Sequence, residues 1–114
     1  MKLPTLFATL KKVREFERLE LPFIKALIDF DIIIEVGLAQ ELGKTITPKQ
    51  LFLVKIGSVS TVRRRLAALV TKGIVRRRKN KHDHRSDVLT VAPPTLKQLD
   101  RYAGVLATIS LPPK

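Results

Sequence analysis

Apolar residues recur along the first half of the chain with the spacing of helices. Over residues 5–19 they return every three or four positions, which predicts an amphipathic helix. Residues 22–43 are apolar almost throughout, and Pro22 suits the first turn of a helix while Gly43 suits its end. This predicts a second helix over 22–43. One amphipathic stripe does not use so many apolar residues, so this helix is either central to the core or half of a subunit interface.

A close pair of helices is predicted next. Thr47 followed by Pro48 is a helix-start signal, and the short helix PKQLFLVKI follows it. Ser58 then caps a helix over 59–72, which stops at Gly73. Two helices joined by so tight a turn predict a helix-turn-helix. Any two helices of an all-α bundle could show the same sequence pattern.

A hairpin is predicted directly after this pair. Ile74 and Val75 begin a strand-like stretch, Lys79–Arg85 is polar and turn-prone, and Val88–Val91 is strand-like again. A last helix is expected at about 95–109. The predicted fold is therefore mainly α with a small β-hairpin wing, a winged helix-turn-helix.

Length and composition favour a small domain of this kind. A chain of 114 residues suits one domain, with an N-terminal helix (1–21), a winged-helix core (22–92) and a C-terminal helix (93–114). The absence of cysteine excludes disulfides and thiolate metal sites. Neither a convincing signal peptide nor a run of about 18 apolar residues is present. These features predict a soluble, cytoplasmic protein.

The positive charge is concentrated in one stretch. The chain has a net charge of +12, and residues 60–85 hold ten Lys/Arg against one acid, a net of +9. A solvated basic face or a disordered tail would be the ordinary explanation. This stretch is interior and patterned with apolar residues, so the concentration indicates a polyanionic partner instead.

The helix over 59–72 separates its residues by face. At about 100° per residue the core side comprises Val59, Val62, Leu66 and Leu69. Arg64 projects on the opposite side near the N-terminus, where an arginine that pairs with guanine contributes about 1–3 kcal/mol of discrimination. A third phosphate contact is the alternative for Arg64. Arg63 and Arg65 lie on the flanks and are expected to contact phosphates.

The second arginine triplet belongs to the hairpin. In a strand, Arg76 and Arg78 share one face and Arg77 takes the other. A basic hairpin beside a helix in the major groove can reach a neighbouring strand or the minor groove. The residues predicted to contact DNA are Ser58, Ser60, Thr61, Arg63, Arg64, Arg65, Arg76, Arg77, Arg78, Lys79, Lys81 and Arg85.

The stretch STVRRRLAALVTKGIVRRRKNKHDHRS resembles the recognition helix and wing of the MarR-type winged-helix regulators, and the resemblance covers about residues 22–96. The family pattern is met by Ser60-Thr61-Val62, the Leu66 and Leu69 pair, Lys72-Gly73-Ile74-Val75 and Asp83-His84-Arg85. By this resemblance Arg85 reaches the minor groove and Asp83 holds it in place. Val91-Ala92-Pro93 stands where the family has Leu-Thr-Pro, and the literal Leu89-Thr90 comes two residues earlier.

The same resemblance implies a homodimer and leaves the effector open. Family members interlock through long terminal helices, whereas the helices expected here at 5–19 and 95–109 are short. We still expect a homodimer through the terminal helices and part of 22–43, because so much apolar surface needs covering. Family members often bind small aromatic effectors, but no sequence feature identifies such a pocket, so no ligand and no cofactor are predicted.

Other chemistry has little support. His82-Asp83-His84 invites a metal-site interpretation, but these are the only two histidines of the chain and no second cluster completes a site. No nucleophile–base pair or phosphate loop is recognisable, so no enzyme is predicted. The leading hypothesis is a dimeric transcriptional regulator that reads double-stranded DNA. The alternatives are a winged helix that binds nucleic acid with little sequence preference, as a replication, partition or RNA-associated factor does, and one used for protein contacts.

Overall fold

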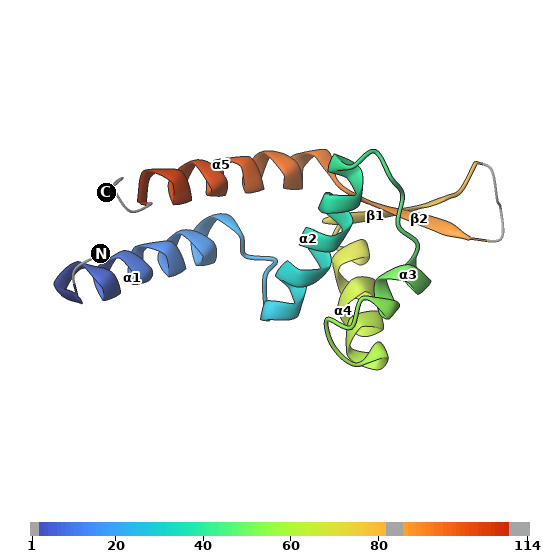
Figure 1. Cartoon of the computed structure of the whole chain (residues 1–114), viewed down its shortest axis with the longest axis horizontal. Coiled ribbons are helices and arrows are strands. Elements are labelled where there is room, and N and C mark those ends of the chain that lie inside the picture. The colour runs from blue at the N-terminus through green and yellow to red at the C-terminus, as the bar shows by residue number, and fades with distance from the viewer. Residues whose placement is uncertain (1–2, 82–85, 110–114) are drawn as a thin grey trace.

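Five helices and one hairpin follow one another in the computed structural model, which describes residues 3–81 and 86–109. Their order is α1 (Leu3–Glu20), α2 (Leu27–Glu41), α3 (Pro48–Leu53), α4 (Val59–Thr71), β1 (Val75–Lys79), β2 (Asp87–Val91) and α5 (Pro93–Ile109). The terminal helices α1 and α5 extend beside each other at one end of the molecule (Figure 1), and the hairpin projects at the other end of its 54 Å length. The predicted winged helix-turn-helix is confirmed.

Side-chain caps begin the two helices of the helix-turn-helix. The Thr47 hydroxyl accepts a hydrogen bond from the Gln50 N–H at 3.1 Å, and the Gln50 side chain accepts from the Thr47 N–H at 2.8 Å. Ser58 caps α4 in the same way, accepting from the Thr61 N–H. Gly73 then ends α4 with φ 74°, a left-handed conformation that glycine adopts without steric cost.

The second helix starts five residues later than predicted. Pro22 lies in a turn that precedes α2, so its placement in the first turn of that helix is wrong. The start signal is Asp29, whose carboxylate accepts hydrogen bonds from the Lys25 and Ala26 N–H groups at 2.7 and 3.1 Å. These bonds satisfy donors that the first turn leaves unpaired, which allows the helix to begin at Leu27.

The core lies between α2, α3, α4 and the hairpin. Its buried side chains include Ile32, Ile33 and Val36 from α2, Leu51 from α3, Val62, Leu66 and Leu69 from α4, and Val75, Leu89 and Val91 from the strands. The predicted core side of α4 is confirmed for three of its four members. The prediction for Val59 is wrong, because this residue is 46% exposed at the first position of the helix, beyond the edge of the packed layer.

The two strands pair antiparallel, with Val75 opposite Val91 and Lys79 opposite Asp87. This register places Val75, Arg77 and Lys79 on one face of β1 and leaves Arg76 and Arg78 on the other, because successive side chains of a strand alternate. The hairpin is joined to the core by the Leu89 N–H, which donates a hydrogen bond to the Ile46 carbonyl at 2.9 Å. The wing is therefore an extension of the folded core.

Aromatic and polar contacts tie α1 and α5 to α2. The Tyr102 ring of α5 stacks against Phe16 of α1 and Phe30 of α2, each at a centroid distance of 5.8 Å. The Tyr102 hydroxyl donates to the Glu17 carboxylate at 2.5 Å, and Arg101 pairs with Glu20 at 3.1 Å. Within the described residues no helix combines the length and apolarity needed to cross a membrane.

Candidate nucleic-acid interface

One arginine from each of the two triplets lines the same groove. A groove of about 440 Å³ lies where α3, α4 and β1 come together. Arg63 of α4 and Arg77 of β1 both line it, beside the ring of Phe52 and the small side chains Ala67 and Thr71. Two cations from two elements thus face the same concave surface, which suits a phosphate-bearing ligand.

Three of the six triplet arginines have partners inside the protein. The Arg63 guanidinium stands over the Phe52 ring, 5.3 Å from its centroid, a cation–π contact that restricts where the charge lies. Arg77 Nε donates to Asp87 at 2.6 Å, and Lys79 lies 3.4 Å from the other carboxylate oxygen. The hydrogen bond from Arg77, with a weaker contribution from Lys79, holds the pKa of Asp87 below its usual value.

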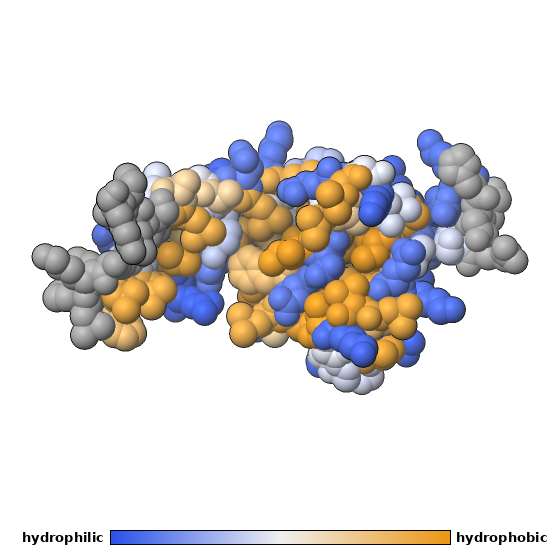
Figure 2. Space-filling model, viewed as in Figure 1, coloured by the Kyte–Doolittle hydropathy of each residue, from blue (hydrophilic) through white to orange (hydrophobic). Residues whose placement is uncertain are grey.

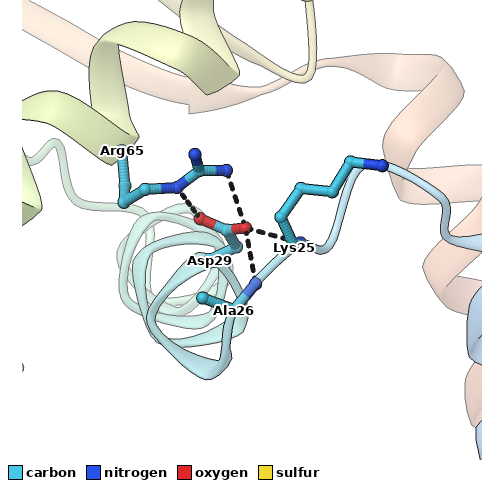
Figure 3. Close-up of polar contacts among 4 residues, drawn as sticks. All are labelled: Lys25, Ala26, Asp29 and Arg65. Carbon is cyan, nitrogen blue, oxygen red and sulfur yellow. Dashed lines mark hydrogen bonds and ion pairs between the residues drawn. The ribbon is translucent and has the colours of Figure 1, made fainter.

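Arg65 is the third partnered arginine. Its guanidinium forms a two-bond contact with Asp29, with Nε to Oδ1 at 2.7 Å and Nη2 to Oδ2 at 2.9 Å (Figure 3). Only 17% of its side chain is exposed, and the Asp29 side chain is fully buried. Two of its five N–H donors therefore serve an internal carboxylate, and the phosphate contact expected of Arg65 stays a prediction.

The buried carboxylate of Asp29 stays ionised. Burial by itself raises the pKa of Asp29, but the Arg65 hydrogen bonds and the Lys25 and Ala26 N–H groups outweigh that effect and lower the pKa below its ordinary value. The same pairing raises the pKa of Arg65. A paired and hydrogen-bonded charge avoids most of the penalty that an isolated buried charge would carry.

The remaining three arginines are exposed. Arg64, Arg76 and Arg78 make no ion pair or hydrogen bond within residues 3–81 and 86–109. Arg64 lies on the outward face of α4, on the side opposite the buried Leu66 and Leu69. Unpaired guanidinium groups keep all of their donors for a ligand.

The other predicted contact residues differ in how free they are. Ser58, Ser60 and Thr61 share hydroxyl contacts at the start of α4, with Ser58 donating to Thr61 Oγ1 at 2.9 Å. Lys79 and Lys81 are exposed on the hairpin. Asp83 and Arg85, with the His82-Asp83-His84 metal hypothesis, lie outside the described residues. No group of three metal-ligating side chains occurs in the part of the chain that the structure describes.

Sequence reasoning missed the partners that hold the arginines. Asp29, Phe52 and Asp87 each orient one guanidinium, yet none of them stands out in a motif. Asp29 offered one signal, an acid among buried apolar residues of a helix. A buried carboxylate needs a cation or several donors. Asp31 stands among the same apolar residues but is only half-buried, so the sequence did not show which of the two acids needs a partner.

Solved structures share this arrangement of helices and wing. A MarR mutant from E. coli, crystallised in complex with operator DNA, matches 93% of this chain and 76% of its own, with a TM-score of 0.60 and 19% identity. A MepR mutant from an S. aureus clinical isolate matches 96% of this chain and 78% of its own, with a TM-score of 0.69 and 13% identity. The chain has the MarR fold. No family model and no curated protein matches its sequence.

The MarR fold agrees with the resemblance seen in the recognition helix and wing. A structure described as the multiple antibiotic resistance repressor MarR also covers 96% of this chain, with a TM-score of 0.60 and 20% identity. Of these similar structures, one is described as a repressor and another as a complex with operator DNA. The groove between α3, α4 and β1 therefore belongs to a fold whose solved members include one seated on operator DNA.

Proposed function

We propose that this protein is a double-stranded-DNA-binding transcriptional regulator and not an enzyme. The observation that carries the proposal is the meeting of the two arginine triplets, with Arg63 and Arg77 lining one groove and Arg64 alone on the outward face of α4. In this arrangement α4 enters the major groove and the basic hairpin follows the backbone or the minor groove. A role on DNA goes with a cytoplasmic location.

The arginines divide into readers and positioners. Arg64 is the candidate base reader, because it is exposed and has no partner among the described residues. Arg63, restrained by Phe52, and Arg77, restrained by Asp87, suit phosphates on either side of the groove. Arg76 and Arg78 add charge along the opposite face of the wing. Asp83 and Arg85 keep their proposed roles at the tip by resemblance alone.

A homodimer is the proposed assembly. The face shown in Figure 2 carries apolar surface over the central and terminal helices, and an apolar groove of about 700 Å³ runs between α2 and α5. Exposed apolar side chains on these elements include Phe7, Leu10, Ile34, Leu38, Leu96 and Leu106. A second copy would cover this surface, and two copies would present two recognition helices to an inverted-repeat site. Sedimentation at twice the mass of one chain is the expected result.

Salt-dependent titration and library selection test the DNA proposal. A random duplex is titrated by fluorescence anisotropy at several salt concentrations, and a random-sequence duplex library is selected with the same protein. We expect affinity to fall steeply with salt, with a log–log slope of about 0.9 for each phosphate contacted. An inverted-repeat site should be enriched. No binding at low salt would refute the proposal.

A pair of matched variants separates base recognition from the general effect of positive charge on DNA binding. Arg64→Ala and Arg78→Ala each remove one unpaired exposed arginine. We expect Arg64→Ala to relax the preference at one base position by about 1–3 kcal/mol. Arg78→Ala should weaken binding to all sequences alike and reduce the salt slope by about 1. Uniform losses from both variants would favour nucleic-acid binding without sequence preference.

A further inference from the structure

Asp29 is the point at which three segments of the chain meet (Figure 3). Its Oδ2 atom accepts from the backbone N–H groups of Lys25 and Ala26, which lie in the link between α1 and α2. Oδ1 and Oδ2 each accept one hydrogen bond from Arg65 on α4, 36 residues further along the chain. One buried side chain thus holds the link, the first turn of α2 and the middle of α4 together.

This contact restrains the rotation of α4 about its own axis. The packing of Val62, Leu66 and Leu69 against the core holds α4 in place, but apolar burial is non-directional and tolerates small rotations. A two-bond contact between a guanidinium and a carboxylate is directional. Arg65 lies on the flank of α4, so its fixed position sets the angle at which the outward face is presented.

Small rotations of α4 matter for its neighbour Arg64. Side-chain tips lie about 5–6 Å from a helix axis, so a rotation of about 10° moves them by about 1 Å. Two-bond recognition needs geometry held within about 0.5 Å. An α4 free to rotate by this amount would keep its charge near the DNA but lose the alignment of Arg64 with a base edge.

We propose that Asp29 is a positioning residue for base recognition, acting through Arg65 to set the orientation of α4 and hence of Arg64. The inference rests on the proposed function. Asp29 is fully buried, so its side chain offers no surface to a ligand outside the protein. Its negative charge separates two possible effects of its removal. Loss of the charge alone would strengthen binding to any DNA, whereas loss of positioning would weaken discrimination between sequences.

The test compares Asp29→Asn with Asp31→Asn. Asp31 stands two residues along α2 and makes no ion pair or hydrogen bond among the described residues. Both variants remove one negative charge, but only Asp29→Asn breaks the contact with Arg65. The probes are a duplex carrying the site that the unaltered protein enriches from a random library, and a scrambled duplex of the same composition. Anisotropy at one salt concentration gives the ratio of the two affinities.

We expect both variants to bind the scrambled duplex at least as tightly as the unaltered protein. Asp29→Asn should lower the affinity ratio by about fivefold or more, the equivalent of about 1 kcal/mol. Asp31→Asn should leave the ratio unchanged. An equal fall for both variants would overturn the positioning role, because charge alone would then explain it.

Arg65→Lys is the second variant, and it carries the test if Asp29→Asn does not fold. Lysine keeps the positive charge but cannot form the two-bond contact. We expect the ratio to fall as it does for Asp29→Asn, with no further fall when the two changes are combined. Thermal unfolding followed by circular dichroism checks that each variant is folded.

The failures of the two proposals are distinguishable. If the unaltered protein enriches no site, the proposed function fails and the positioning role fails with it. If a site is enriched but folded Asp29→Asn and Arg65→Lys keep the original ratio, the positioning role alone is refuted.

Discussion

Tyr102→Phe is expected to loosen the attachment of α5 to α1 without disturbing the aromatic packing. The hydroxyl of Tyr102 donates to Glu17 Oε2 at 2.5 Å, and its ring stacks on Phe16 and Phe30 at 5.8 Å. Phenylalanine keeps both ring contacts and removes only the oxygen. The change therefore isolates one hydrogen bond between a neutral donor and a charged acceptor.

The stability lost with this hydrogen bond can be bounded in two ways. A hydrogen bond to a charged group contributes about 1.5–3 kcal/mol net, but the Glu17 side chain is 12% exposed, so water replaces part of the loss. Burial, followed by the bond to Glu17, raises the pKa of Tyr102 to about 12 from 10. That difference corresponds to about 3 kcal/mol, an upper bound because burial supplies the larger part. We expect a loss of about 1–2 kcal/mol in the free energy of unfolding.

Urea unfolding at neutral pH measures this loss. The matched control is Arg101→Gln, which breaks the other polar contact between α5 and α1. Arg101 and Glu20 are 63% and 36% exposed, so this pair should contribute less than about 0.5 kcal/mol. Equal effects of the two changes would refute the assignment of Tyr102 as the stronger contact.

The pH dependence provides a second check on the same contact. A pKa raised on folding means that the contribution of Tyr102 is complete below about pH 10, the ordinary pKa, and is lost as the pH rises toward about 12. Tyr102 is the only tyrosine of the chain, so ultraviolet absorbance of tyrosinate follows this one group. A midpoint near 10 in the folded protein would show that the hydroxyl is neither buried nor bonded as described.

Three further changes test local features by urea unfolding. Asp29→Asn should lower the free energy of unfolding most at neutral pH. The difference in this free energy from the unaltered protein should shrink as the pH falls below about 4, because the lowered pKa of Asp29 means that acid removes its contribution. A difference that stays constant with pH would argue against an ionised partner for Arg65. Thr47→Ala should cost about 1 kcal/mol through loss of the α3 cap, and no loss would mean that the cap is replaced by water. Lys55→Gly should stabilise by up to about 1 kcal/mol, because Lys55 has φ 66°, and a destabilised variant would contradict that backbone conformation.

Local signals in the sequence predicted most of the elements correctly. Helix caps and stops depend on residues within one turn of each other, as Thr47 with Gln50 and Ser58 with Thr61 show. The buried face of α4 followed from spacing alone, because Val62, Leu66 and Leu69 fall on one side of any helix. The basic hairpin followed from strand-like residues on either side of a polar tip.

Tertiary structure decided what spacing does not contain. The start of α2 depends on a carboxylate three residues inside the helix, so the proline signal at Pro22 was misleading. Val59 shares the core face of α4 on a helical wheel, yet it lies past the edge of the layer that covers that face. Periodicity gives direction around a helix but not how far a neighbouring element extends.

The division of the arginines was also decided in three dimensions. The sequence alone determined that a helix and a hairpin carry two arginine triplets, and hence that a polyanion is the expected partner. It did not determine which arginines are free, because Arg65 is neutralised by Asp29 and Arg63 is restrained by Phe52. Such pairings join residues of different elements, and no spacing pattern in the sequence reveals them. Only the packing of α2, α3 and α4 against one another establishes them.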